Sequence, residues 1–224
     1  MNITGKAKTI LTNCLISALV LSVLLSSSAF AGFRGRDVSN QVKKAKKAII
    51  LVGDSTTWHM SMYASSKVRK NYYFVYANGR GILDLKNNYG GFKTDLVKAM
   101  KKYPKATVVF MLGSNQNYES TDEERLRVYD SFINNKAYRK HRFVVSTLAK
   151  TTISRGPNAN SRVKAFNRKI RSHYAGSGKV RVYDLYAYLD PRIHTKKDTR
   201  SGDGIHYKNG TYTGILKNLR KAVG

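Results

Sequence analysis

Five short runs of β-branched and aromatic residues, separated by longer segments with helical periodicity, constrain the fold of this chain most. Each run is nearly continuous in apolar residues, which is typical of strands buried on both faces of a parallel sheet. Alternation of such strands with helices predicts an α/β fold, a doubly wound sheet covered by helices. The predicted strands are Ala48–Val52, Tyr72–Tyr76, Thr107–Leu112, Phe143–Thr147 and Val180–Tyr183.

A helix with charged ends is predicted between the third and fourth strands. Ser120 or Thr121 can cap its start, and three acidic residues follow in the first turn, Asp122, Glu123 and Glu124. The basic residues at its far end are Arg139, Lys140 and His141. Acids at the start and bases at the end complement the helix dipole, so this charge pattern indicates helix stability rather than binding.

The N-terminus has the features of a secretory signal peptide. Lys6 and Lys8 precede an apolar stretch of residues 14–25, and small residues ending in Ala31 follow it. This order predicts cleavage after Ala31 and a secreted or periplasmic protein. The apolar stretch is shorter than the ~20 residues that span a bilayer. An uncleaved anchor is the alternative.

Removal of residues 1–31 leaves 193 of the 224 residues, which is close to the usual size of one domain. Residues 32–47 are polar and basic and predict a lead-in, so the folded domain is expected over residues 48–224. Cys14 is the only cysteine, and it stands at the start of the apolar stretch rather than after it. The exported chain is therefore expected to have no lipid anchor, disulfide or thiolate metal site.

The chain is strongly basic. Its formal net charge of +28 becomes +26 without the leader, which contains two lysines and no acid. Such a charge attracts polyanions, whether nucleic acid, anionic lipid or acidic glycan. Export argues against a nucleic-acid partner, and the oligomeric state stays open.

Three polar motifs stand where functional groups gather in an open parallel sheet. Gly53-Asp54-Ser55 follows the first predicted strand, Gly113-Ser114-Asn115 follows the third, and Asp203-Gly204-Ile205-His206 precedes the last helix. In such sheets the loops at the carboxyl ends of the strands converge on one crevice. The motifs are therefore expected to share a site.

These motifs contain the groups that nucleophilic catalysis needs. A serine hydroxyl is a weak nucleophile at neutral pH, and His206 is the candidate base that takes and returns the proton of Ser55. Asp203 can hold the imidazole in one tautomer and stabilise the imidazolium. His194, near Asp190 and Asp198, is the rival base.

The motifs resemble the four blocks of the SGNH, or GDSL-like, hydrolases, which supply Ser, Gly, Asn and His. Gly53-Asp54-Ser55-Thr56 is similar to the first block, Gly113-Ser114-Asn115-Gln116 to the third and Asp203-Gly204-Ile205-His206-Tyr207 to the last. Asn78-Gly79-Arg80-Gly81 stands in the place of the second block, with Gly81 favoured and Gly79 as the alternative. Three residues depart from the family pattern: Thr56, Gln116 and Tyr207.

The resemblance implies a three-layer α/β/α sandwich with a five-stranded, flavodoxin-like parallel sheet. It also implies an oxyanion hole from the backbone N–H groups of Ser55 and Gly81 and the side-chain amide of Asn115. No cofactor is implied. A metal site is not expected, because the five histidines show no ligand pairing at helical spacing.

Aromatic residues flank the motifs and are candidates for binding substrate, namely Trp58, Tyr118 and Tyr207. Packing on the sheet is the alternative for each. Fifteen tyrosines against eight phenylalanines favour a wet, hydrogen-bonding surface. We therefore expect a serine esterase that removes short acyl groups, above all acetyl, from a carbohydrate. The alternatives are a lipolytic enzyme of the same family and a non-catalytic glycan-binding module.

Overall fold

The structure is a computed structural model, and it describes residues 48–115, 120–150, 159–190 and 205–224. All of these residues belong to one compact unit of the chain. The predicted leader, residues 1–31, and the predicted lead-in, residues 32–47, lie outside the described residues. Within the described part, no helix is both long and apolar enough to span a membrane.

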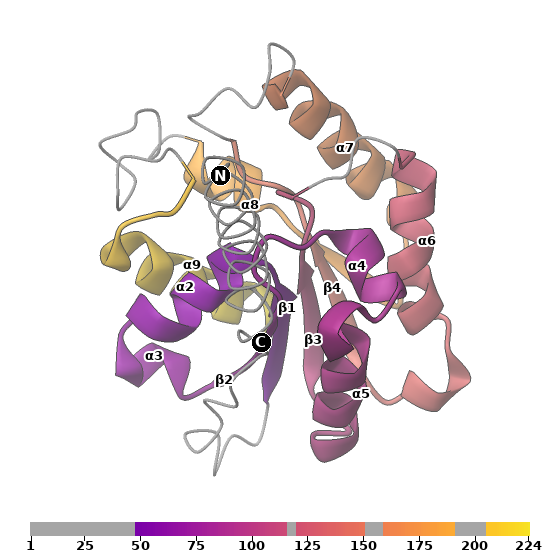
Figure 1. The fold of residues 1–224 in the computed structure, drawn as a ribbon, viewed down its shortest axis with the longest axis horizontal. Coiled ribbons are helices and arrows are strands. Elements are labelled where there is room, and N and C mark those ends of the chain that lie inside the picture. The colour runs from indigo at the N-terminus through magenta and orange to yellow at the C-terminus, as the bar shows by residue number, and fades with distance from the viewer. Residues whose placement is uncertain (1–47, 116–119, 151–158, 191–204) are drawn as a thin grey trace, which may run out of the picture. The chain divides into compact units, whose positions relative to one another are not determined.

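A five-stranded parallel sheet forms the centre of this unit (Figure 1). Its strands lie in the order β2-β1-β3-β4-β5. Every neighbouring pair is parallel, and Gly53 at the end of β1 is in register with Tyr76 of β2 and Met111 of β3. The strands are β1 (Ile49–Gly53), β2 (Tyr72–Tyr76), β3 (Thr107–Met111), β4 (Arg142–Ser146) and β5 (Val180–Tyr183).

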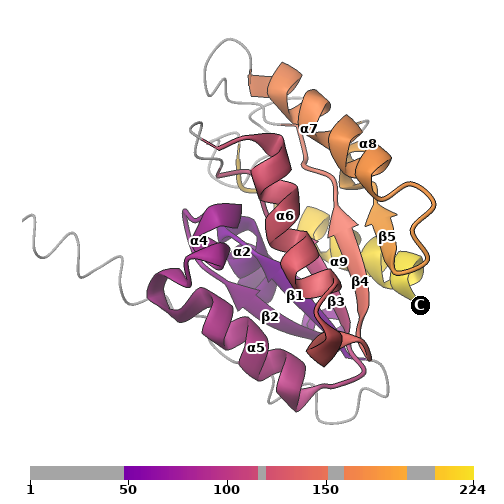
Figure 2. The same ribbon diagram turned by 90° about the vertical axis from the view of Figure 1, so that its right-hand side faces the viewer.

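Helices cover both faces of the sheet (Figures 1 and 2). Side chains of α4, α5, α6 and α7 pack on one face, and those of α2, α3, α8 and α9 pack on the other. The helices are α2 (Ser55–Tyr63), α3 (Ser66–Arg69), α4 (Ile82–Lys86), α5 (Phe92–Lys102), α6 (Asp122–Ile133), α7 (Ala159–His173), α8 (Leu185–Leu189) and α9 (Asn209–Val223). Two 3₁₀ turns, η2 (Tyr89–Gly91) and η3 (Lys136–Tyr138), complete the described elements.

The apolar runs of the sequence form strands because each can bury both of its faces. In β1, Ile50 and Val52 point into the core on one side and Leu51 into the core on the other, and all three are fully buried. The predicted three-layer α/β/α sandwich with a five-stranded parallel sheet is confirmed. Each predicted strand matches an observed strand to within one residue at either end.

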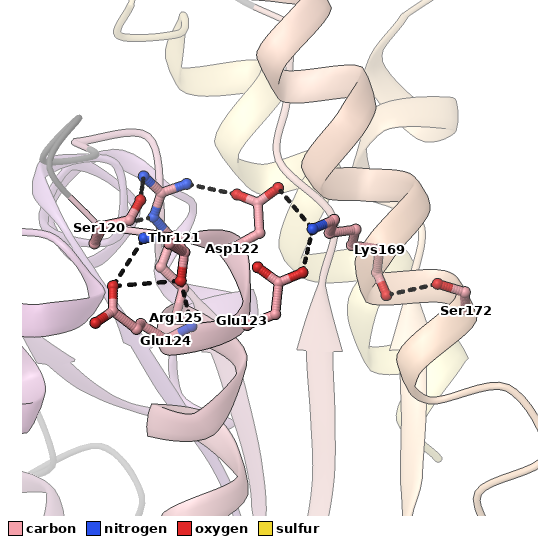
Figure 3. Close-up of polar contacts among 8 residues, drawn as sticks. All are labelled: Ser120, Thr121, Asp122, Glu123, Glu124, Arg125, Lys169 and Ser172. Carbon is pink, nitrogen blue, oxygen red and sulfur yellow. Dashed lines mark hydrogen bonds and ion pairs between the residues drawn. The ribbon is translucent and has the colours of Figure 1, made fainter.

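The predicted charged helix is right at its start and wrong at its end. Thr121 caps α6 in a capping box with Glu124: each side chain binds the backbone N–H of the other residue (Figure 3). The α-helix ends at Ile133, so Arg139, Lys140 and His141 are not its last turn. Asn135 caps η3 instead, because its side chain accepts the N–H of Ala137 and favours a new turn there.

The sheet topology sets the position of the candidate site. Along the chain, β2 is added on one side of β1 and β3 on the other, so the connections leave the carboxyl ends of β1 and β3 in opposite directions. This is the switch point at which open α/β sheets bind their ligands. Ser55 follows β1 after one intervening residue, Asp54, and Ser114 and Asn115 follow β3 within four residues of Met111.

Candidate active site

Ser55 and His206 lie within hydrogen-bond distance although 151 residues separate them in sequence. The distance between His206 Nε2 and Ser55 Oγ is 3.0 Å. Ser55 is the first residue of α2, and His206 lies just before α9, which packs beside α2. This is the geometry in which an imidazole nitrogen can take a hydroxyl proton.

Asp54 fixes the turn that presents Ser55. Its side chain caps α2 by accepting the N–H of Thr56 at 2.9 Å. The same carboxylate accepts a hydrogen bond from the Ser114 hydroxyl. Asp54 therefore ties the segment after β1 to the segment after β3, a connection that the sequence did not indicate.

The carboxyl group of Asp54 is almost completely buried, with 1% of the residue exposed. Burial raises the pKa of Asp54, and hydrogen bonds from Ser114 and Thr56 together with the charge of His206 oppose this rise. Because the pKa is raised, the folded protein holds the Asp54 proton to a higher pH than the unfolded chain does.

As the pH rises, the free energy of unfolding of an Asp54→Asn variant should therefore increase relative to that of the wild type. In the wild type, ionisation of Asp54 lowers the free energy of unfolding between the unfolded pKa, near 3.8, and the raised folded pKa. Asparagine has no such ionisation. Urea unfolding of both proteins from pH 4 to pH 8 measures the difference, which should grow and then level off. A difference that shrinks with pH would contradict the raised pKa.

The ring of His206 is stacked on a second imidazole. The centroids of His59 and His206 are 4.1 Å apart and their planes differ by 10°. His59 comes from the second turn of α2, four residues after Ser55. The stack fixes the plane of the His206 ring from the same helix that positions the nucleophile. The sequence puts His59 four residues after Ser55, but nothing in it indicates that His59 contacts the base.

Gly81, rather than Gly79, lies against the third motif. A Cβ atom at Gly81 would stand 2.3 Å from the carbonyl oxygen of Asn115, whereas one at Gly79 would meet nothing within 4 Å. Gly81 therefore has to be glycine for the second and third motifs to touch. Its N–H donates to Asp84 Oδ2 at 2.7 Å, so this bond has to open before Gly81 can donate to an oxyanion.

Alanine substitutions at the two glycines should separate their roles. In Gly81→Ala, the new Cβ has to push Asn115 away, so we expect kcat to fall by about 10²-fold or more, the scale of losing one oxyanion donor. In Gly79→Ala, the positive φ of 68° costs about 1–2 kcal/mol of stability, with kcat nearly unchanged. Steady-state kinetics and thermal unfolding of both variants check this. The opposite pattern would assign the role to Gly79.

The predicted aromatic residues fall in different places. Trp58 is half-buried on α2 and packs edge-on against His59, with ring centroids 4.7 Å apart. Tyr207 is 6% exposed and belongs to the core, where its N–H donates to the Tyr212 hydroxyl. Burial raises the pKa of Tyr207, as does the nearby charge of Asp54. Tyr207 therefore packs in the core, as the alternative interpretation of this residue predicted, and its ring does not face substrate.

Several predicted residues lie outside the described part of the chain. These are Asp203, Tyr118, Gln116 and the rival base His194. Among the residues that the structure describes, no three His, Cys, Asp or Glu side chains gather closely enough to bind a metal ion.

No family model matches the chain, and no curated protein matches it in sequence. Solved structures do match its fold. A putative acylhydrolase from Bacteroides fragilis superposes with a TM-score of 0.61 and 14% identity, covering 83% of this chain and 93% of its own. A GDSL-like lipase from Bacteroides thetaiotaomicron superposes with a TM-score of 0.58 and 14% identity, covering 88% of this chain and 94% of its own.

A third similar structure is the C-terminal catalytic domain of the peptidoglycan O-acetyltransferase OatA from Streptococcus pneumoniae. It superposes with a TM-score of 0.58 and 12% identity, covering 80% of this chain and 94% of its own. The chain thus has the fold of the SGNH, or GDSL-like, hydrolases.

Proposed function

We propose that this protein is a serine esterase that removes short acyl groups, above all acetyl, from an extracellular or cell-envelope carbohydrate. The observation that carries the proposal is the 3.0 Å distance between Ser55 Oγ and His206 Nε2. It is supported by a fold whose known members include acylhydrolases and an O-acetyltransferase domain.

In the proposed reaction, Ser55 Oγ attacks the ester carbonyl while His206 Nε2 takes the hydroxyl proton. The oxyanion forms near the start of α2, where the Ser55 N–H, the Gly81 N–H and the Asn115 amide are the proposed donors. His206 then gives the proton to the departing sugar oxygen. Water, activated by His206, hydrolyses the acyl-enzyme, and Asp203 is the proposed partner that orients the imidazole.

The second candidate is a lipolytic enzyme, which is supported by the GDSL-like lipase with the same fold. The preferred acyl length of the substrate separates the two candidates. Aryl esters from acetyl to palmitoyl, together with acetylated polysaccharides, should be tested on the wild type and Ser55→Ala. We expect the wild type to have its highest kcat/KM on the acetyl esters and Ser55→Ala to hydrolyse none of the esters. A maximum at long chains would favour the lipolytic enzyme, and no hydrolysis of any ester would favour a binding module.

Export is the second part of the proposal. Cleavage after Ala31 makes Gly32 the first residue of the mature protein, without a lipid. N-terminal sequencing of the exported protein tests this. Retention of Met1 would indicate an uncleaved anchor.

The net charge of the protein should affect its reaction with an anionic polymer and its reaction with a neutral ester differently. Exposed charges are screened beyond ~8 Å at physiological ionic strength, so salt should weaken encounter with an anionic polymer and spare a neutral ester. We expect kcat/KM on an acidic acetylated glycan to fall steeply with added salt, and that on a neutral aryl acetate to change little. Salt titrations on one preparation measure both. Equal responses would remove the acidic substrate from the proposal and leave the esterase.

A further inference from the structure

A cavity of about 180 Å³ lies between α7 and α8. The residues that line it are Lys164, Asn167, Arg168, Arg171 and Tyr186. None of the residues that line this cavity belongs to the candidate active site.

The cavity is built on the segment that leaves the carboxyl end of β4. The buried side chain of Asn167 holds the backbone of Leu148, accepting its N–H at 2.7 Å and donating to its carbonyl oxygen at 2.9 Å. The N–H of Tyr186 donates to the hydroxyl of Thr147 at 2.9 Å. The cavity therefore lies at the carboxyl end of the sheet, as Ser55 does.

Three cationic side chains share the cavity face of α7. Lys164, Arg168 and Arg171 are separated by four and then three residues, so they lie on one side of the helix. Asp184 holds Arg171, whose Nη2 lies 2.9 Å from both carboxylate oxygens. Within the described residues, no carboxylate forms an ion pair with Lys164 or Arg168.

Two other bases of α7 are paired with acids of α6. Lys169 reaches Glu123 of α6, as Figure 3 shows, and His173 Nε2 lies 2.9 Å from Asp130. The cavity face thus holds three cations against one acid, Asp184. Like charges three or four residues apart repel, and a bound anion would relieve that repulsion.

The cavity is connected to the candidate oxyanion loop through Leu148. A Cβ atom at Gly113 would stand 2.9 Å from Leu148 Cδ2, so the Leu148 side chain packs on the segment that continues into Ser114 and Asn115. Two strand spacings separate β1 from β4, which is about 10 Å at ~4.8 Å each. A saccharide that reached from Ser55 to the cavity would have to span at least this distance.

We propose that this cavity is a subsite for the acidic group of an anionic saccharide whose ester lies at Ser55. The group is a carboxylate or a phosphate, which Arg168 and Arg171 can bind through their guanidinium N–H groups and Lys164 as a point charge. The aromatic ring of Tyr186 can pack against the sugar that carries the acidic group. The inference rests on the proposed function and adds the class of substrate to it.

Direct binding tests the subsite without catalysis. Calorimetry on Ser55→Ala should use trigalacturonate for the carboxylate, glucose 6-phosphate for the phosphate and maltotriose as the neutral sugar. We expect at least one anionic sugar to bind well above maltotriose. Replacing both Lys164 and Arg168 by Gln should then weaken that binding at least tenfold. Binding of all three sugars alike would overturn the subsite.

A matched control removes two positive charges elsewhere. Lys98 and Lys101 are exposed on α5, which packs beside β2 at the opposite edge of the sheet. Replacing both by Gln should change the affinity less than twofold. An equal loss in the two double variants would mean that net charge, not the cavity, attracts the sugar, and would overturn the proposal.

Aryl acetate hydrolysis separates the two proposals. With Ser55 present, the Lys164/Arg168 double variant should hydrolyse a neutral aryl acetate as the wild type does. Failure of the wild type to hydrolyse it would refute the esterase, whereas the calorimetry would still decide whether the cavity binds an acidic sugar.

Discussion

Replacing either Ser55 or His206 by alanine should lower kcat/KM for an aryl acetate by about 10⁴- to 10⁶-fold. The two side chains lie 3.0 Å apart and act as one unit, because the hydroxyl attacks only when the imidazole takes its proton. The double variant should therefore be no slower than the slower single variant. Initial rates over a range of ester concentrations, with active-site titration of the wild type, measure the effect.

Controls of the same residue types separate catalysis from folding. Ser172 and His173 are exposed on α7, and Ser172→Ala and His173→Ala should keep full activity. Thermal unfolding should show that the Ser55 and His206 variants remain folded. A folded Ser55→Ala protein with wild-type activity would refute the assignment of the nucleophile.

Asn115→Ala should lower kcat by about 10²- to 10³-fold and change KM little. An oxyanion donor acts on the charge that develops in the transition state and hardly on the bound ester, so its loss costs turnover rather than binding. In the structure the Asn115 backbone lies against Gly81, at the point where the second and third motifs meet.

The split between the two kinetic constants decides the role of Asn115. Measuring kcat and KM separately for Asn115→Ala and Asn115→Asp checks it, because the aspartate has nearly the same shape but would repel an oxyanion. If KM rises while kcat is unchanged, Asn115 binds the substrate and is not an oxyanion donor.

The sheet could be predicted from sequence because its strands are buried on both faces. A run such as Ile49 to Val52 has no polar side to show, and only a strand between two layers of helices satisfies it. The meeting of Ser55 and His206 followed from the positions of their motifs. Parallel strands send their carboxyl ends to one edge, so motifs distant in sequence converge there.

Side-chain partners could not be predicted in the same way. The hydrogen bond from Ser114 to Asp54 and the stack of His59 on His206 depend on the rotation of helices about their axes and on the backbone of loops. Neither has a periodic signal in sequence. Tyr207 shows the same limit, because a tyrosine after the last motif suits a wet surface and a buried hydrogen bond equally well.

The end of α6 was mispredicted for a local reason. Basic residues complement a helix dipole when they stand in the last turn, so Arg139, Lys140 and His141 suggested a helix that reaches them. Two asparagines intervene. Asn134 is the C-cap, and Asn135 starts η3 by accepting the N–H of Ala137, a side-chain bond that competes with helical geometry.

Covalent labelling tests the central claim most directly. Phenylmethylsulfonyl fluoride transfers its sulfonyl group to an activated serine with release of fluoride. Peptide mass spectrometry of the treated protein should find one sulfonyl group on Ser55, formed in step with the loss of aryl acetate hydrolysis and much more slowly in His206→Ala. Loss of activity with Ser55 unmodified and the label on another residue would contradict the account.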